Sequence, residues 1–349
     1  MTGYHYQAAI LFEWLFFFSF IFLLSWGLTR CITKIALRHS LLDIPNQRSS
    51  HCCPTPRGGG IAILLAFYLG GAYLVFTGKV AVPYLLVLSG CGLGIAIIGL
   101  LDDLFHLTAF KRIIVHFGCA LLAVQFLHSG SDIFMPLGEG ISSVIKLISL
   151  TVGIVWLINL YNFMDGIDGL AGSEAVSVAV GASLLLFYSG GQGSCFFLLL
   201  LFASSVFGFL VLNWSPARIF MGDVCSGFLG FFFAIIALFT VQSTKMTLSA
   251  WMILLGVFVA DSTVTLLVRV SRGKRFYEAH CSHAYQILSR HLRSHKKVTI
   301  GVLAVNVLWL LPWAFCAISW PAYSLLFILL SYAPLVLICL MVGAGTINE

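Results

Sequence analysis

The sequence predicts an all-α, polytopic integral membrane protein, because its composition does not suit a fold surrounded by water. Of its 349 residues, 60% are hydrophobic and only 9% are charged, whereas a soluble domain is about 45–50% apolar and about 25% charged. A water-soluble fold of this size cannot bury so much apolar surface. The same composition excludes intrinsic disorder. No low-complexity linker divides the chain, so we expect residues 1–349 to form one transmembrane domain.

The first five predicted spans are apolar runs of about the 20 residues that cross the hydrocarbon core. A basic loop separates the first from the second, and three glycines open the second. Two adjacent carboxylates end the third, and a segment rich in Asn and Asp ends the fifth. These spans lie near 14–36, 60–77, 82–101, 112–128 and 144–163.

Six further runs complete a predicted bundle of eleven helices, so the two termini are expected on opposite sides of the membrane. They lie near 172–189, 194–213, 226–242, 249–268, 298–316 and 322–343. Asp261 lies inside the ninth span, and an acid at that depth needs a partner. Arg269 or a neighbouring helix could supply one, and structural and functional roles for Asp261 stay equally open.

Basic residues predict the orientation, because Lys and Arg accumulate in cytoplasmic loops. Of the 19 Lys and Arg residues, only Lys79, Lys146 and Lys245 fall on the side opposite the others. The N-terminus is therefore expected outside and the C-terminus inside the cell. Most acids, together with His280 and His283 of the longest cytoplasmic loop, fall on the same basic side. This asymmetry counts against a transporter, whose binding site would lie near mid-membrane.

Asp102 and Asp103 are adjacent carboxylates at the end of the third span. Ionisable groups beside hydrocarbon are costly and indicate a functional site, and adjacent like charges raise each other's pKa unless a cation offsets them. A divalent metal ion or a cationic partner would do this. A solvated helix end with two capping acids is the alternative.

The densest polar segment, residues 159–171, interrupts a long apolar run. Asn162, Asp165 and Asp168 are spaced by three residues, so a continuing helical turn would align them on one face. The glycines of the segment allow the backbone to approach a ligand. A simple turn needs only one Asp-Gly pair, and the two pairs here favour a binding site.

Asp223 follows a glycine at the expected start of the eighth span, within the polar segment 213–227. An acid at this position either caps the helix or holds a Mg²⁺ ion that in turn carries phosphate. The segment alone does not decide between them. It is not a P-loop, because no Gly-Lys-Ser/Thr follows.

Two basic loops are candidates for binding an anion. The loop that precedes the second span carries Arg48, His51 and Arg57 with three glycines, which suits an anion at a helix start or simply a Pro/Gly loop of a cytoplasmic face. In the longest cytoplasmic loop, His280 and His283 would bind a metal or donate to phosphate, or the loop contacts lipid headgroups. No other Cys or His has the spacing of a zinc site.

Five motifs in order carry a resemblance to a known family. They are Pro-Thr-Pro-Arg-Gly-Gly-Gly at 54–60, Asp102-Asp103, Asn159 to Ala171, Phe220-Met-Gly-Asp223-Val-Cys-Ser and the His280/His283 loop. Together they resemble the polyprenyl-phosphate N-acetylhexosamine-1-phosphate transferases of glycosyltransferase family 4. That superfamily starts O-antigen, enterobacterial common antigen, teichoic acid and peptidoglycan lipid intermediates. The predicted topology, with eleven spans and the N-terminus outside the cell, is similar to that of its non-peptidoglycan branch.

The resemblance implies a transferase that moves N-acetylhexosamine-1-phosphate from a UDP-sugar to undecaprenyl phosphate and releases UMP. It implies Mg²⁺ as cofactor, with Mn²⁺ as an alternative, and a site on the cytoplasmic face of the bacterial inner membrane. Besides the UDP-N-acetylhexosamine, the partners are undecaprenyl phosphate and membrane lipid, with no nucleic acid, and a homodimer stays open. Phosphoryl transfer relies on positioning and charge neutralisation more than on covalent help.

The resemblance also assigns roles to the candidate residues. Asp102, Asp103 and Asp223 are expected to be catalytic, with Asp223 and Asp102 as metal ligands. The expected substrate-binding residues are Asn162, Asp165, Asp168, Asn213, Phe220, Arg48, His51, Arg57, His280 and His283.

Two departures from the family pattern bear on these roles. His106 stands where the family often has the third acid of Asp-Asp-x-x-Asp, so no carboxylate role carries over there. The His-x-His-His motif is reduced to His280-Cys-Ser-His283. Ser282 to Gln286 resembles the subgroup that starts O-antigen from UDP-N-acetyl-fucosamine or -quinovosamine, for which Phe276, Tyr277 or Tyr285 would form an apolar wall.

The alternative function is a nucleotide-sugar or polyprenyl-lipid transporter. Such a protein needs charged residues at mid-depth on several helices, and Asp261 is the one serious candidate. A haem-binding electron carrier would need paired histidines inside facing spans, and His116 has no obvious mate.

Overall fold

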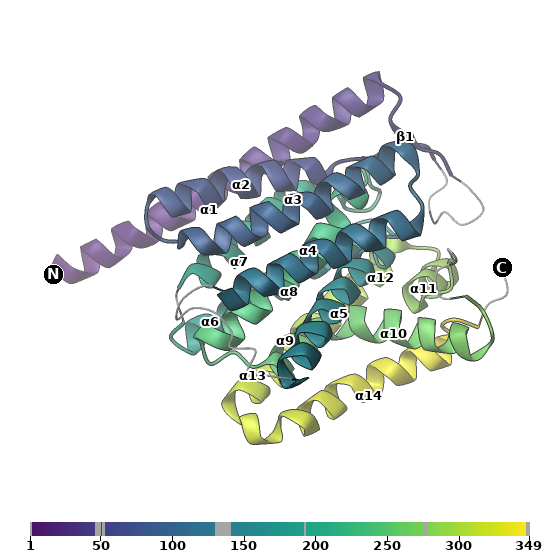
Figure 1. Cartoon of the computed structure of the whole chain (residues 1–349). Coiled ribbons are helices and arrows are strands. Elements are labelled where there is room, and N and C mark those ends of the chain that lie inside the picture. Colours follow the sequence, from purple (N-terminus) through teal and green to yellow (C-terminus); the bar gives the residue numbers. More distant parts are fainter. Residues whose placement is uncertain are drawn as a thin grey trace.

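Long helices form nearly all of the computed structural model (Figure 1). The structure describes residues 2–45, 50, 53–129, 141–191, 193–275, 278 and 280–346. The first eight helices are α1 (Thr2–Arg38), α2 (Gly60–Phe76), α3 (Val82–Phe105), α4 (Ala109–Ser129), α5 (Ile141–Phe163), α6 (Leu170–Tyr188), α7 (Ser194–Asn213) and α8 (Asp223–Ser243). Between α1 and α2, the two-residue strands β1 (Leu42–Asp43) and β2 (Thr55–Pro56) pair antiparallel.

In the second half of the chain the helices are shorter and more often interrupted. It contains α9 (Leu248–Leu254), α10 (Gly256–Ser271), α11 (Ala284–Leu292) and α12 (His295–Val305). The π-helix η1 (Asn306–Leu310), α13 (Leu311–Ser319), the 3₁₀-helix η2 (Pro321–Tyr323) and α14 (Ser324–Val342) follow.

The helices confirm an all-α polytopic membrane protein. Within the described residues, nine helical segments are long and apolar enough to cross a membrane, and α9 with α10 forms a tenth that is bent by 77°. The short apolar helix α2 has 17 residues. Each of the eleven predicted spans thus corresponds to one helix or to a run of consecutive helical segments, while the number of eleven crossings stays a prediction.

Helix α8 forms the centre of the bundle, and every residue from Val224 to Thr240 is buried. Its phenylalanines contact neighbouring helices, as in the stacking of Phe232 on Phe202 of α7 with ring centroids 3.7 Å apart. Two glycines let the flanking helices approach it closely. A Cβ on Gly99 of α3 would lie 2.1 Å from the carbonyl oxygen of Asp223, and a Cβ on Gly230 would lie 2.1 Å from that of Leu157 in α5.

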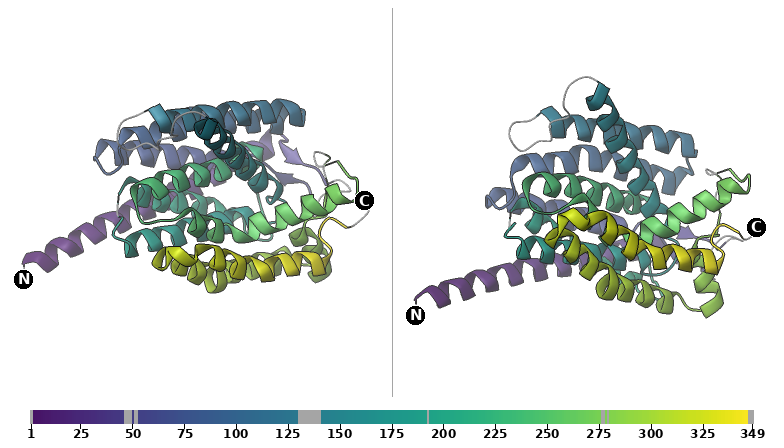
Figure 2. Two further views of the ribbon diagram at one scale, coloured as in Figure 1. Left: turned by 60° about the horizontal axis from the view of Figure 1, so that its bottom comes forward. Right: turned by 90° about the horizontal axis from the view of Figure 1, so that it is seen from below.

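The polar connections gather at one end of the bundle, where Figure 1 shows β1, α11 and the end of the described chain. Helices α3, α5 and α7 end there, and α2, α6, α8 and α12 begin there. The start of α1 lies at the opposite end in every view (Figure 2). This arrangement brings the segments with the candidate residues into one region, which we call the polar end.

Candidate active site

The start of α8 brings carboxylates from two helices together. Asp103, in the last turn of α3, is buried, and its Oδ2 accepts a hydrogen bond from the backbone N–H of Val224 at 3.1 Å. Gly222 lies against the same oxygen, since a Cβ there would be 2.6 Å from Asp103 Oδ2, and its φ is +81°. Asp103 therefore stabilises the first turn of α8, and a glycine at 222 leaves room for it.

Arg112, in the first turns of α4, pairs with two further acids. Its Nη1 lies 2.6 Å from Asp102 Oδ2 and 2.9 Å from Asp223 Oδ2. Asp102 and Asp103 thus have different partners, as expected for neighbours that point about 100° apart on a helix. A second arginine, Arg57, donates a hydrogen bond to the backbone carbonyl of Asp103 and lies 3.8 Å from its Oδ1.

A turn joins α5 to α6, so the alignment on one helical face that the three-residue spacing would give Asn162, Asp165 and Asp168 does not form. Asn162 lies on α5 and donates a hydrogen bond to Ser226 Oγ at 3.0 Å, but α5 ends at Phe163, and Asp165 and Asp168 lie in the turn. The chain leaves the helix after Phe163, and Gly169, with a φ of +73°, is the residue from which α6 starts. The segment still serves the site, since the turn directs Asp165 toward the acids of α3 and α8.

Asp165 shares a cavity with Asp103 and Asp223. Burial and the negative charges of Asp223 and Asp103 raise the pKa of Asp165 well above its usual range. Among the described residues, more negative than positive charge therefore surrounds the carboxyl group of Asp165. A divalent cation would relieve this repulsion.

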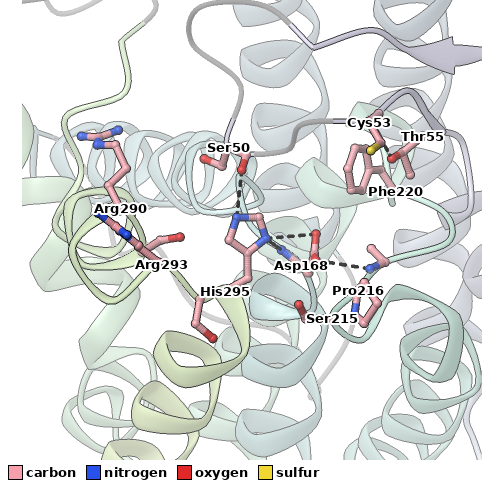
Figure 3. Close-up of a pocket in the computed structure, with 13 residues that line it drawn as sticks. Ser50, Cys53, Thr55, Asp168, Ser215, Pro216, Phe220, Arg290, Arg293 and His295 are labelled. Atoms are coloured by element: carbon pink, nitrogen blue, oxygen red, sulfur yellow. Dashed lines mark hydrogen bonds and ion pairs between the residues drawn. The ribbon is translucent and has the colours of Figure 1, made fainter.

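Asp168 is held by the start of α12 and by the loop after α7 (Figure 3). Its Oδ1 lies 3.2 Å from His295 Nδ1, and its Oδ2 accepts a hydrogen bond from the backbone N–H of Ala217 at 3.2 Å. Burial alone would raise the pKa of Asp168, but the hydrogen bond and charge of His295 together with the Ala217 N–H lower it below its usual value. Asp168 is therefore a fixed anion.

Asn213 and Phe220 hold the loop that joins α7 to α8. Asn213 Oδ1 accepts a hydrogen bond from the backbone N–H of Gly169 at 3.1 Å, and its Nδ2 donates to the carbonyl of Ile219 at 2.9 Å. The backbone N–H of Phe220 donates to the carbonyl of Pro56 in β2 at 2.8 Å. The loop is thus tied both to the α5–α6 turn and to the segment before α2.

Two cavities meet at Asp168, Phe220 and His295, which line both. The smaller, of about 210 Å³, is the acidic cavity, with Asp103, Asp165 and Asp223 on its wall. The larger, of about 590 Å³, is the outer cavity. Its far wall carries Arg290 and Arg293, which Figure 3 shows on the other side of His295 from Asp168. A negative and a positive compartment therefore adjoin.

The donor set of the acidic cavity fits a hard divalent cation. Carboxylate oxygens are the ligands that Mg²⁺ prefers, and it often takes only one or two of them beside water and phosphate. In the described part of the chain, no three Asp, Glu, His or Cys residues are grouped closely enough to hold a metal on their own. A cation bound by Asp223 and Asp102 would have to share them with Arg112, and phosphate oxygens would complete its coordination.

His280 and His283 line neither the acidic nor the outer cavity, so the structure does not place them with the carboxylates of the acidic cavity. His283 Nδ1 lies 3.2 Å from Asp261 Oδ1. Burial, His283 and Arg269 lower the pKa of His280 to about 3. A role for either histidine in substrate binding stays a prediction, and Arg48 and His51 lie outside the described residues.

The open question about Asp261 has a structural answer. Its carboxylate accepts hydrogen bonds at 2.9 Å from the backbone N–H groups of Ala284 and Tyr285. These groups open α11, where no helical partner is available to them. Asp261 therefore fixes α11, whose Gln286 lines the acidic cavity.

Arg112 and His295 were not among the residues predicted from the sequence. The sequence pattern indicates Arg112 only as one of many cytoplasmic charges, although it follows the adjacent acids after a short turn. His295 lies in a basic stretch with no motif around it. Arg112 could have been found by asking which cation offsets Asp102, whereas the pairing of His295 depends on a contact across 127 residues.

Comparison with known proteins places the chain in a family. Residues 85–241 match the model of glycosyl transferase family 4. The chain is 31% identical to a phospho-N-acetylmuramoyl-pentapeptide-transferase of Geobacillus sp. (strain WCH70), over 73% of this chain and 81% of that protein. It is 27% identical to a probable undecaprenyl-phosphate N-acetylglucosaminyl 1-phosphate transferase of Bacillus subtilis (strain 168), over 88% of this chain and 87% of that protein.

A third relative covers a similar share of the chain. The chain is 26% identical to the undecaprenyl-phosphate alpha-N-acetylglucosaminyl 1-phosphate transferase of Yersinia pestis, over 78% of this chain and 75% of that protein. The family match runs from α3 to α8 and includes the carboxylates Asp102, Asp103, Asp165 and Asp223. The chain therefore belongs to glycosyl transferase family 4, in the superfamily of polyprenyl-phosphate N-acetylhexosamine-1-phosphate transferases.

Proposed function

We propose that the protein transfers an N-acetylhexosamine-1-phosphate from a UDP-sugar to undecaprenyl phosphate and releases UMP. One observation carries the proposal beyond family membership. Asp102, Asp103, Asp165 and Asp223 meet two arginines, Arg57 and Arg112, at one end of a membrane bundle. Carboxylates for a divalent cation and guanidinium groups for phosphate are what phosphoryl transfer between two phosphate-bearing substrates requires.

The two cavities suggest how the nucleotide sugar binds. The outer cavity offers the Phe220 ring, the fixed anion Asp168 and polar loop groups for the uridine. The acidic cavity then receives the diphosphate. Asp223 of this cavity and the neighbouring Asp102 would hold Mg²⁺, which would supply positive charge for the diphosphate, and Mn²⁺ is an alternative. Arg57 and Arg112 hold the remaining phosphate charge.

The reaction needs positioning more than acid–base help. An oxygen of the lipid phosphate attacks the β-phosphorus of the UDP-sugar, the new P–O bond forms the pyrophosphate, and the bond from the β-phosphorus to the bridging oxygen breaks to leave UMP. A phosphate monoester with a second pKa near 6 is largely dianionic at neutral pH. Asp103 is already engaged with the start of α8, so we assign it a positioning role.

The polar end is proposed to face the cytoplasm of a bacterial inner membrane, where UDP-sugars are made. The prenyl chain of the acceptor then lies in the bilayer beside the bundle while its phosphate reaches the acidic cavity. We further propose that the product starts a lipid-linked O-antigen for lipopolysaccharide.

The sugar is proposed to be a 6-deoxy-N-acetylhexosamine, N-acetylfucosamine or N-acetylquinovosamine. Tyr285 supports an apolar wall, since its ring is buried beside Gly166 of the acidic cavity and its hydroxyl donates to the carbonyl of Phe163 at 2.9 Å. With its hydroxyl engaged, Tyr285 offers no free polar group behind Gly166. The other two proposed wall residues, Phe276 and Tyr277, lie outside the described residues.

The test is purified protein with undecaprenyl phosphate, Mg²⁺ and a panel of UDP-sugars, read out as UMP. We expect UMP only when both substrates are present. A preference for the 6-deoxy sugars in kcat/KM supports the subgroup, but only up to about 10²-fold, because an apolar pocket rejects an added hydroxyl weakly. Preference for UDP-N-acetylglucosamine would refute the sugar proposal alone. Uptake of intact UDP-sugar into proteoliposomes without UMP would instead favour a transporter.

A further inference from the structure

A third cavity, of about 460 Å³, opens between α1 and the loop that follows α7. Trp26 and Arg30 line it from α1, and Trp214 and Arg218 line it from the loop. None of its lining residues is a carboxylate. The cavity is therefore different in character from the acidic cavity, and a phosphate held here would not meet the proposed catalytic groups.

The two arginines of this cavity lack an anionic partner within the described residues. Each of the ion pairs found there involves other cations. The guanidinium of Arg30 lies 4.9 Å from the ring centroid of Trp26, which orients it without neutralising it. Two exposed guanidinium groups on one cavity favour a phosphate, whose oxygens match their paired N–H donors.

The surface adjoining the cavity is apolar. On α1, Phe20 and Leu23 precede Arg30 in the direction of the opposite end of the bundle, and each is about half exposed. On α7, Phe207 and Val211 are exposed to a similar degree, and the Phe207 ring packs on Phe22 with centroids 5.2 Å apart. Tryptophan and arginine above an exposed apolar strip are typical of the membrane interface.

We propose that this cavity binds an anionic phospholipid, with its phosphodiester between Arg30 and Arg218 and its acyl chains along the exposed faces of α1 and α7. The charge complementarity selects an anionic headgroup, since basic residues near a membrane surface attract anionic lipid. The lipid is a resident ligand and not the acceptor of the reaction. The inference stands independently of the proposed function.

The site also touches the loop that holds Asp168. Ser215 and Pro216 line both this cavity and the outer cavity. The next residue, Ala217, donates its N–H to Asp168. A lipid that packs against one side of the loop therefore stabilises the wall of the outer cavity on the other side.

The experiment compares the wild-type chain with the double variant Arg30→Gln/Arg218→Gln, both in detergent. Phosphatidylglycerol, phosphatidylcholine and inorganic phosphate are added separately, bound lipid is counted by native mass spectrometry, and Tm is measured. Arg38→Gln is the matched control, because Arg38 is exposed on the same helix but does not line the cavity. Both altered arginines are exposed, so the double variant is expected to fold.

We expect wild type and Arg38→Gln to retain one phosphatidylglycerol and to gain Tm with it but not with phosphatidylcholine. The double variant should lose the bound lipid and the gain in Tm. Equal retention of phosphatidylglycerol by the double variant would overturn the site. An equal gain in Tm from inorganic phosphate would overturn its assignment to a lipid, as would displacement of the lipid by an equimolar amount of undecaprenyl phosphate.

Discussion

Four aspartates of the polar end differ in what surrounds them, and this difference separates their roles. Asp103 holds the first turn of α8, Asp102 pairs with Arg112, and Asp165 faces like charges. Asp223 is shared between Arg112 and the acidic cavity. Among the four, Asp223 combines access to the cavity with a position at a helix start.

Replacing Asp223 by Asn should reduce UMP release by at least about 10²-fold, the scale of a metal-positioning or acid–base group. The amide keeps the shape of the side chain and removes the charge that a divalent cation needs. Steady-state kinetics at several Mg²⁺ concentrations measure the effect, with Tm as the check on folding. Near-normal turnover at ordinary Mg²⁺ would show that Asp223 serves only the helix start.

Replacing Arg112 by Gln should have opposite effects on metal binding and turnover. The guanidinium now occupies oxygens of Asp102 and Asp223 that we assign to the cation, so its removal should tighten Mn²⁺ binding in the absence of substrate. UMP release should fall by about 10-fold or more, because charge neutralisation at the phosphates is lost.

Electron paramagnetic resonance of Mn²⁺ measures the binding directly. Lys111→Gln is the matched control, since Lys111 is an exposed neighbour outside the described ion pairs. Unchanged Mn²⁺ affinity in Arg112→Gln would contradict the shared use of these carboxylates.

Replacing Asp165 by Asn should raise Tm at neutral pH when no divalent cation is present. Because the folded state raises the pKa of Asp165, the neutral acid is favoured, and stability is lost as the pH rises from the unfolded value of about 3.9 through the folded one. The variant is neutral at every pH, so its advantage should vanish below about pH 4. Asp43→Asn, on the same cavity, is the control. An advantage independent of pH would contradict the electrostatic cause.

At the scale of elements, the turn between α5 and α6 shows what a pattern in the sequence can and cannot predict. The two Asp-Gly pairs predict that the chain leaves the helix here, which the turn confirms, while the approach of this segment to a ligand stays a prediction. The spacing of three residues wrongly suggested a helix, because it describes a helical face only where the helix continues. The chain instead turns to fit α11, since a Cβ on Gly166 would lie 2.1 Å from the Tyr285 hydroxyl.

Replacing Gly166 by Ala should therefore lower both Tm and UMP release, because the methyl group overlaps the Tyr285 hydroxyl. Removing that hydroxyl in Gly166→Ala/Tyr285→Phe should restore part of the loss. The four proteins of this double-mutant cycle are compared by thermal unfolding and by turnover. Losses that simply add would show that the two residues do not compete for the same space.

The close approach of α3 and α5 to α8 could not be predicted from the sequence. Gly99 and Gly230 are two glycines among 33, and only the packing shows that each one admits a backbone oxygen. Composition shows that a helix is apolar, but not which neighbour it contacts. The same reason explains why Arg112 and His295 were missed.

For the whole molecule, composition was enough to predict the fold class, because lipid demands long apolar helices with internally satisfied backbones. The arrangement of the helices does not show which end of the bundle faces the cytoplasm. The distribution of Lys and Arg predicts this orientation. The termini lie at opposite ends of the bundle, and the candidate residues lie at the end richer in Lys and Arg. A cytoplasmic active site therefore depends on the direction of insertion.

A green fluorescent protein fused after the C-terminus should fluoresce, because it folds in the cytoplasm, while alkaline phosphatase fused at the same place should be inactive. The reverse pattern would place the polar end outside the cell and remove its access to UDP-sugars. Membrane fractionation confirms that both fusions are inserted. The outcome tests the orientation without reference to activity.

The burial of α8 has an electrical consequence. Aligned peptide dipoles place the equivalent of roughly half a positive charge at the start of a helix, and water normally screens much of it. Here the helix from Val224 to Thr240 is surrounded by side chains, so its field reaches the acidic cavity with little attenuation. That field depends on neither pH nor a bound ion. The helix start therefore offsets part of the negative potential that Asp103, Asp165 and Asp223 create in the acidic cavity, and this contribution should persist even when every cation has been removed by chelation.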